Sequence, residues 1–308
     1  MIATVTLNPA LDKMLSLSSF KIGRLNRLDK LVTLPGGKGV NMAIMLKNLG
    51  QDVLAMGLIG DFTGEVIEDR LRSQGISIAF QHISGSSRTN VFISEPKRRS
   101  TEILAPGPTI RPEETDKFLV GYERSLSGYD VVVIGGSVPP GARESIYKEM
   151  VMLAKAKGLF TVLSAGGQCF ANALEVAPDL VKPDVRNTPD VLGIDSATPA
   201  GRGKIAERLF SMGVSKVIIA FNGSSHAVYS ADEAFEIIAP EHKIKNTVLA
   251  DDAFLAGMVD ALQRGRSLSE AAIWSMATEI AVSQEPEKRW AAPDEVSRYL
   301  SLVKRKDL

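Results

Sequence analysis

The sequence predicts an α/β protein built on a doubly wound, mostly parallel β-sheet. Short runs of apolar, β-branched residues alternate along the chain with longer segments in which apolar residues recur with the helical period. The apolar runs are continuous and not alternating, as expected of strands that are buried on both faces of a parallel sheet. Repeated strand–helix units of this kind wind in a right-handed sense and place helices on both faces of the sheet.

Six apolar runs are expected to form the strands of this sheet, and they cover residues 2–7, 53–59, 131–134, 160–163, 180–182 and 217–220. Five further segments have the helical pattern, at residues 42–49, 112–126, 142–157, 200–212 and 251–263. In the first of these, apolar side chains recur at i, i+3, i+4 and i+7, and Gly50 follows as a signal for the helix end.

Two segments interrupt the pattern, at about residues 13–34 and 88–104. Both are rich in charged and alternating residues, and neither contains a long helical period. We expect them to form a small β-sheet that projects from the main domain as a lid; an edge hairpin with surface loops fits the pattern equally well. Because no linker rich in Gly, Pro or Ser divides the chain, residues 1–308 are expected to form a single domain.

The composition restricts the classes of function. With 36 Lys and Arg against 36 Asp and Glu, the chain lacks the basic excess expected of a protein that binds nucleic acid or an anionic membrane surface. No apolar run approaches the ~20 residues of a membrane-spanning helix. The single cysteine, Cys169, excludes an internal disulfide framework and favours the cytoplasm. The three histidines have no metal-ligand spacing, so no metal site is expected. A small-molecule ligand is the remaining expectation.

The segment GGKGVN at 36–41 is the first candidate ligand site. Its glycines let the backbone approach a ligand, the following helix offers its N-terminus, and Lys38 adds a cation suited to phosphate. The segment is not a Walker A loop, because Gly39 replaces the required Ser or Thr. A glycine-rich turn with a surface lysine is the structural alternative.

Other polar residues follow predicted strands or begin a helix. Asp12 and Ser137 each follow a predicted strand, and ligands of doubly wound sheets bind where the strands end. Asp251 and Asp252 begin a helix, where the dipole stabilises a carboxylate and where a general base could face a substrate. Each has a structural alternative, since Asp is common in turns and at helix N-termini.

Taken in order, these motifs resemble those of the PfkB (ribokinase-like) carbohydrate kinases, in particular the branch that holds 1-phosphofructokinase and tagatose-6-phosphate kinase. The matching segments are TLNPALD at 6–12, PGGKGVNMA at 35–43, GLIGDFTG at 57–64, SRTNV at 87–91, GGSVPPG at 135–141, KPD at 182–184 and DDAFLAGM at 251–258. The resemblance implies a ribokinase-like αβα sandwich with a β-sheet lid that often forms a homodimer. It also implies transfer of the ATP γ-phosphoryl group to a sugar hydroxyl, with Mg²⁺.

The resemblance also assigns roles to residues. Asp252 corresponds to the general base. The substrate side, for a ketohexose phosphate, comprises Asp12, Gly37, Lys38, Asn41, Arg88, Asn90 and Ser137, with Arg88, Asn90 and Lys38 holding the existing phosphate. The nucleotide side comprises Lys182, Asp184, Asn187, Asn222, Gly223, Ala250 and Asp251.

The nucleotide side departs from the family pattern. Where the family has Gly-Ala-Gly-Asp, this chain has LADD at 249–252, which places bulk and an extra negative charge where backbone amides would bind the transferring phosphoryl group. Asn187 replaces a Glu, Ser164 replaces an Asp, and the turn at 220–225 lacks two glycines. Two hypotheses follow: a sugar-phosphate kinase with an impaired nucleotide half, or a pseudokinase that binds or senses a sugar phosphate.

Overall fold

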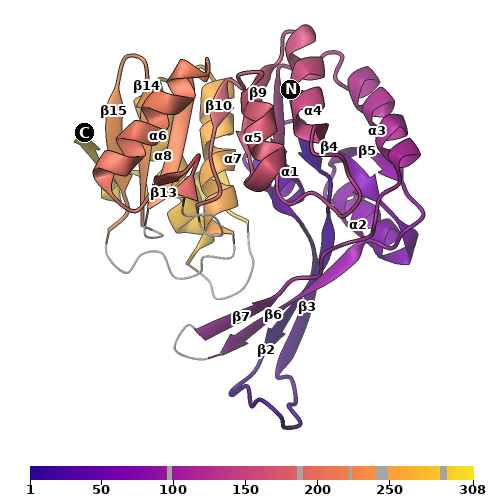
Figure 1. The fold of residues 1–308 in the computed structure, drawn as a ribbon. Helices are drawn as coiled ribbons and strands as arrows, with labels where there is room; N and C mark the ends of the chain where they lie inside the picture. Colours follow the sequence, from indigo (N-terminus) through magenta and orange to yellow (C-terminus); the bar gives the residue numbers. More distant parts are fainter. Residues whose placement is uncertain (96–98, 186–189, 222–223, 241–248, 285–289) are drawn as a thin grey trace.

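A ten-stranded sheet crosses the main body of the protein, and a four-stranded sheet projects from it (Figure 1). The computed structural model describes residues 1–95, 99–185, 190–221, 224–240, 249–284 and 290–308. The large sheet is mostly parallel and is covered by helices on both faces, so the predicted fold class is confirmed.

The large sheet has the order β16-β15-β14-β13-β10-β9-β8-β1-β4-β5. Strands β13 through β5 in this order pair in parallel, whereas β14, β15 and β16 add an antiparallel edge. All six predicted strands are present. The bounds are β1 (Ile2–Thr6), β4 (Val53–Ile59), β5 (Ser77–His82), β8 (Val131–Gly135), β9 (Phe160–Ser164), β10 (Leu180–Val181), β13 (Lys216–Phe221), β14 (Ser225–Ser230), β15 (Ala234–Ile238) and β16 (Lys304–Asp307).

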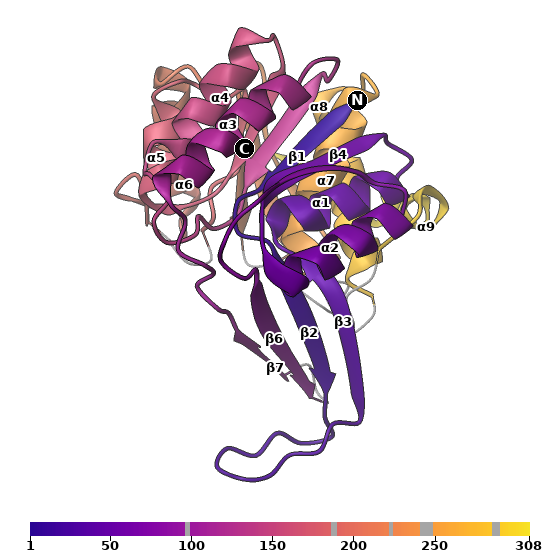
Figure 2. The same cartoon turned by 90° about the vertical axis from the view of Figure 1, so that its right-hand side faces the viewer.

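Helices cover both faces because successive strand side chains point in opposite directions. Val133 of β8 packs in the core on one face and its neighbour Val132 in the core on the other. The first core includes residues of α1 (Lys38–Asn48), α2 (Asp61–Ser73), α7 (Ala250–Gln263), α8 (Leu268–Val282) and α9 (Pro293–Ser297). The second includes residues of α3 (Pro112–Ser125), α4 (Ile146–Ala156), α5 (Gly167–Leu174) and α6 (Pro199–Ser211) (Figure 2).

The helix predicted at 142–157 is shorter than expected and begins at Ile146, because residues 142–145 form a loop and a turn after the left-handed Gly141. A 3₁₀ turn, η2 (Leu300–Leu302), and a two-stranded pair, β11 (Asp190–Val191) with β12 (Ile194–Asp195), complete the elements. Within the described ranges, every helix is too short or too polar to cross a membrane.

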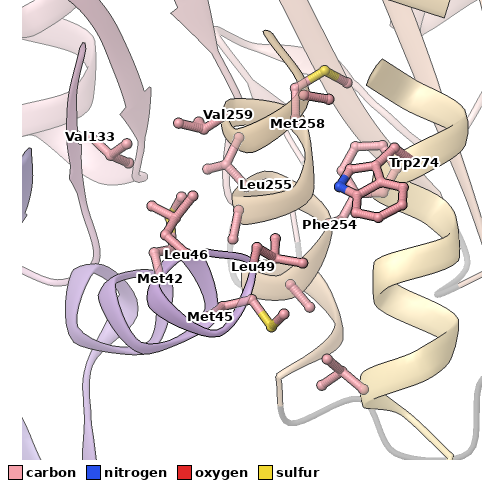
Figure 3. Close-up of a cluster of buried hydrophobic side chains, with 14 of the residues drawn as sticks. Met42, Met45, Leu46, Leu49, Val133, Phe254, Leu255, Met258, Val259 and Trp274 are labelled. Atoms are coloured by element: carbon pink, nitrogen blue, oxygen red, sulfur yellow. The ribbon is translucent and has the colours of Figure 1, made fainter. Parts of the chain in front are cut away.

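Helices α1 and α7 pack against each other through the apolar side chains that recur with the helical period in α1. Leu46 of α1 and Leu49, the residue directly after α1, are directed toward α7, and Phe254 of α7 packs beside Trp274 of α8 (Figure 3). Each of these leucines is at most 1% exposed, and full burial of such a side chain contributes about 1.5–3 kcal/mol. This packing places the first turns of α1 and α7 next to each other at the edge of the sheet where the candidate site lies.

The projecting four-stranded sheet is the small second sheet that the sequence predicted, and it is called the lid below. Its order is β3-β2-β6-β7, and its strands are β2 (Ala10–Ser16), β3 (Lys30–Gly36), β6 (Arg88–Glu95) and β7 (Arg99–Ile103). The first two strands extend beyond the predicted segment 13–34, because Ala10 already pairs with Gly36. Asp12 therefore lies in a lid strand and not in a turn after β1, which corrects the placement expected for it.

Candidate active site

A pocket of about 320 Å³ lies where the lid meets the main sheet. It combines residues of the lid strands, of the first turns of α1 and α7, and of the loops after β8, β9 and β10. The structure brings all seven predicted substrate residues and the predicted base together here. Those lining the pocket are Asp12, Gly37, Lys38, Asn41, Arg88, Asn90, Ser137 and Asp252, and Asp184 of the predicted nucleotide side also lines it.

The chain turns sharply between β3 and α1 at Gly37. This residue has φ 101°, and a Cβ atom there would lie 2.7 Å from Cγ2 of Thr6, so glycine is required. Lys38 is the first residue of α1, and its side chain is 9% exposed. The glycine-rich segment therefore positions a largely buried ammonium group on the pocket wall.

Both carboxylate oxygens of Asp252 are oriented by residues of α1. Nζ of Lys38 lies 2.8 Å from Oδ1, and Nδ2 of Asn41 donates to Oδ2 over 2.7 Å. Each carboxylate oxygen has more than one lone-pair site, so Asp252 keeps acceptor capacity toward the pocket. A fixed carboxylate in a largely buried position is the arrangement that general-base catalysis requires.

Asp12 and Asn90 lie opposite each other on adjacent lid strands. Nδ2 of Asn90 donates to Oδ1 of Asp12 over 2.9 Å, and both residues are less than 5% exposed. The backbone N–H of Ala105 donates to Oδ1 of Asn90. This pair offers the pocket a carboxylate and an amide, the groups that commonly bind sugar hydroxyls.

Arg88 is held at the base of the lid by three hydrogen bonds. Its guanidinium donates to the carbonyl oxygens of Asn8 and Ala105 and to Oγ of Ser137, which also accepts from the side chain of Asn8. Burial lowers the pKa of the Arg88 guanidinium, and the nearby Asp12 carboxylate opposes that shift. Arginine remains charged at any physiological pH. Three of its five N–H groups are used by these bonds, so a fixed cation with donors remaining faces the pocket.

On the other side of Lys38, the acidic residue Asp251 lies between two lysines. Its Oδ2 is 3.1 Å from Nζ of Lys38, and its Oδ1 pairs with Nζ of Lys182. The motif at 249–252 predicted an additional negative charge in the nucleotide half, and in the structure the two lysines compensate this charge. Ala250, which was also predicted to bind nucleotide, is buried in the first turn of α7.

The remaining predicted nucleotide residues, Asn187, Asn222 and Gly223, lie outside the described residues. Ser164, which replaces a family Asp, ends β9 and is buried. Among the residues that the structure describes, no three His, Cys, Asp or Glu side chains gather in a way that could hold a metal ion.

The pocket also contains residues that the motifs did not indicate. These are Phe92, Glu102, Leu104, Ala165 and Gly166, whereas Gly136, which also lines the pocket, belongs to the motif GGSVPPG at 135–141. Strand alternation was a usable signal for Phe92, because residues 88, 90 and 92 share one face of β6. Glu102 of β7 lies next to the pocket because the register of the lid sheet pairs it with Phe92 of β6.

Comparison with protein-family models matches residues 5–284 to the pfkB family carbohydrate kinases. The chain belongs to this family. The family resemblance inferred from the motifs is thereby confirmed, and the match covers the lid, the pocket and α7.

Two curated relatives are similar over most of their length. The 1-phosphofructokinase of Bacillus subtilis (strain 168) is 32% identical over 276 residues, covering 88% of each chain. A tagatose-6-phosphate kinase of Staphylococcus epidermidis is 29% identical over 266 residues, covering 85% of each chain.

Solved structures of pfkB-type and related kinases have the same fold. A protein of Thermotoga maritima described as a possible 1-phosphofructokinase superposes with a TM-score of 0.93 at 30% identity, covering 100% of this chain and 99% of that one. The ribokinase of the same organism gives a TM-score of 0.77 at 19% identity, covering 98% and 99%, which indicates a shared fold alone.

Proposed function

We propose that this carbohydrate kinase transfers the γ-phosphoryl group of ATP to a hydroxyl of a ketohexose phosphate, such as tagatose 6-phosphate or a fructose phosphate. The observation that carries the proposal is the composition of the pocket. A fixed carboxylate, Asp252, and a fixed cation, Arg88, line the same 320 Å³ space. A substrate with both a reactive hydroxyl and a phosphate group matches that pair.

The lid side supplies substrate recognition. The Arg88 guanidinium would bind the existing phosphate through charge-assisted hydrogen bonds. Asp12 and Asn90 would bind ring hydroxyls, because their side chains are mutually oriented and buried. This differs from the phosphate contact that the family resemblance implied for Asn90, since its amide is held against the Asp12 carboxylate. Fixing both ends of the sugar phosphate holds one hydroxyl beside Asp252, and such positioning supplies a large part of the catalysis of phosphoryl transfer.

In the chemical step, Asp252 accepts the proton of the attacking hydroxyl. The hydroxyl oxygen forms a bond to the γ-phosphorus while the bond to the β,γ-bridging oxygen breaks, and ADP leaves with that electron pair. Lys38 and Asn41 hold the Asp252 carboxylate in place throughout. Mg²⁺ that accompanies ATP would neutralise charge on the phosphates.

Two positively charged residues beside the pocket could bind the negatively charged terminal phosphate of a nucleotide. Lys38 and Lys182 carry ammonium groups, and both contact the first turn of α7, whose N-terminus favours anions. Asp251 lies between the two lysines, so a phosphoryl group would compete with its carboxylate for them.

Replacement of the base tests the proposed reaction. We expect Asp252→Asn to lower ADP release by about 10²–10⁴-fold, because the amide cannot accept the hydroxyl proton. ADP release is measured with Mg-ATP and, separately, tagatose 6-phosphate, fructose 1-phosphate and fructose 6-phosphate; the wild type should reach roughly 1–100 s⁻¹ with one of them. An unchanged rate in the variant would contradict the assigned base. A wild type inactive with all three would contradict the kinase function.

The position of Asp251 favours a second candidate function, a sugar-phosphate sensor without kinase activity. A carboxylate between the two lysines already satisfies the cations that an ATP phosphate would use. A thermal shift assay separates the two functions, because a ligand that binds only the folded state raises its stability. The sensor predicts stabilisation by a sugar phosphate and none by millimolar Mg-ATP.

We also propose that two copies of the chain associate through the lid. Six of the thirteen large apolar side chains that are exposed in the described residues lie on or next to the lid strands, namely Ile22, Leu25, Leu28, Leu31, Ile103 and Leu104. Such clustering of exposed apolar side chains is typical of an interaction surface.

A further inference from the structure

Four charged side chains form a continuous row beside the pocket. Lys182 pairs with Asp251, Asp251 with Lys38, and Lys38 with Asp252. Their side chains are between 2% and 18% exposed, and they come from the residue that follows β10 and from the first turns of α7 and α1. The row alternates in sign, so its formal charges cancel.

Lys182 is the most buried member of the row. Its side chain is 2% exposed, and its ammonium pairs with a carboxylate of the first turn of α7. A buried ammonium group requires an anion nearby, because removing its hydration costs several kcal/mol. Asp251 supplies that anion from a position next to the base, Asp252.

The space around Asp251 has the other properties of an anion site. It lies in the first turn of a 14-residue helix whose N-cap, Leu249, makes no side-chain capping bond. Two lysine ammonium groups converge on it. The Asp251 carboxylate thus occupies a position that helix amides and two cations make favourable for negative charge.

We propose that Asp251 is a built-in anion that holds Lys182 and Lys38 until a phosphoryl group arrives, and that both lysines then bind the phosphoryl group in its place. Asp251 is then a positioning residue and Lys182 a phosphoryl-binding residue. The proposal rests on the proposed function, because it identifies the phosphoryl group of ATP as the competing anion. It implies that a phosphate group binds to Lys182 and Lys38 only if it carries enough negative charge to displace the Asp251 carboxylate from them.

The sign of one change in affinity tests the proposal. Asp251→Asn removes the competing charge, so we expect it to bind Mg²⁺ with the non-hydrolysable ATP analogue AMPPNP about tenfold more tightly than the wild type, measured by calorimetry. Weaker or unchanged binding overturns the proposal; weaker binding would mean that Asp251 assists the nucleotide, for example by contacting Mg²⁺. Glu144→Gln, which makes the same change of charge at an exposed site, should alter the affinity less than twofold.

A second variant distinguishes competition from altered folding. Lys182→Met/Asp251→Asn removes both charges of the buried pair, so it should fold even where Asp251→Asn does not. We expect it to bind the analogue no more tightly than the wild type, since the gain requires Lys182; tighter binding would overturn the role of that lysine. Thermal stabilisation of both variants by a ketohexose phosphate tests sugar-phosphate binding at the lid, which does not depend on Asp251. If that stabilisation is present but the change in nucleotide affinity is absent, this proposal fails while sugar-phosphate binding stands; if the stabilisation is absent, the proposed function fails.

Discussion

Glycine at position 36 is required by a side chain and not by the backbone turn. A Cβ atom on Gly36 would lie 1.9 Å from Oδ2 of Asp12, so Asp12 would have to move and lose its bond to Asn90. We expect Gly36→Ala to raise KM for the sugar phosphate about tenfold or more, because it displaces a proposed hydroxyl partner.

The measurement is steady-state kinetics with the sugar phosphate varied. Asp12→Ala serves as the comparison, since both changes remove the same carboxylate from the pocket. The account of Gly36 would be wrong if Gly36→Ala kept the wild-type KM while Asp12→Ala did not.

The residues of the candidate site differ in how visible they are in the sequence. Lys38, Asn41 and Asp252 lie in short contiguous motifs, so their types and spacing indicated an anion-binding turn and an acidic helix start. The ion pair of Asp251 with Lys182 could not be read in this way. It joins residues 69 positions apart and depends on how β10 and α7 are placed by the whole sheet.

Helices α7 and α8 pack closely at Gly257. A Cβ atom there would lie 2.9 Å from the Cα atom of Ser275, so the α8 backbone would have to shift. Overpacking of this kind costs about 1–3 kcal/mol, whereas the helix propensity gained from Gly to Ala is at most about 1 kcal/mol. We expect Gly257→Ala to lower the free energy of unfolding by roughly 1–2 kcal/mol, measured from urea denaturation.

Gly121 in α3 is the matched control, because it is exposed and a Cβ atom there would have no neighbour within 4 Å. Gly121→Ala should raise the free energy of unfolding by about 0.5–1 kcal/mol through helix propensity alone. If both substitutions changed the free energy of unfolding by the same amount, the contact between α7 and α8 would accommodate the added methyl group without a loss of stability, and the prediction would be wrong.

An apolar stripe was enough to predict some helices but not all, since α2 and α5 also have one face more apolar than the other and were not predicted. The helix at α1 has a clear apolar stripe, whereas α8 is buried on nearly all sides and its hydrophobicity has no helical period, so it was not predicted. Its start was visible in a different signal. Ser267 and Glu270 form a capping box in the structure, and Ser-x-x-Glu before an apolar run is the sequence pattern for one.

At the scale of the whole molecule, repetition of strands and helices was enough to predict a mostly parallel sheet. The antiparallel edge formed by β14, β15 and β16 was not predicted. Strands β14 and β15 follow β13 in the element order but contain none of the six predicted apolar runs. Strand β16 comes from the C-terminal end of the chain and pairs with β15 although α7, α8 and α9 lie between them in sequence. The lid was predicted because two segments contain no long helical period, but the sequence did not indicate how its strands pair.

The lid leads to a prediction about assembly. Ile22 and Leu25 lie between β2 and β3 and are 90% and 78% exposed, so water contacts nearly all of their apolar surface in a single chain. Burial of this surface against a second copy would be favourable by about 25 cal/mol per Å². We expect the wild type to sediment as a dimer at micromolar concentration, with an unfolding temperature that rises with protein concentration.

Ile22→Asp/Leu25→Asp should convert the dimer to a monomer without unfolding it, because neither side chain belongs to the core. The control is Val120→Asp, which places one charge on an exposed apolar residue of α3, outside the lid. It should leave the sedimentation coefficient unchanged. A wild type that sediments as a monomer, or a double variant that remains a dimer, would contradict association through this surface.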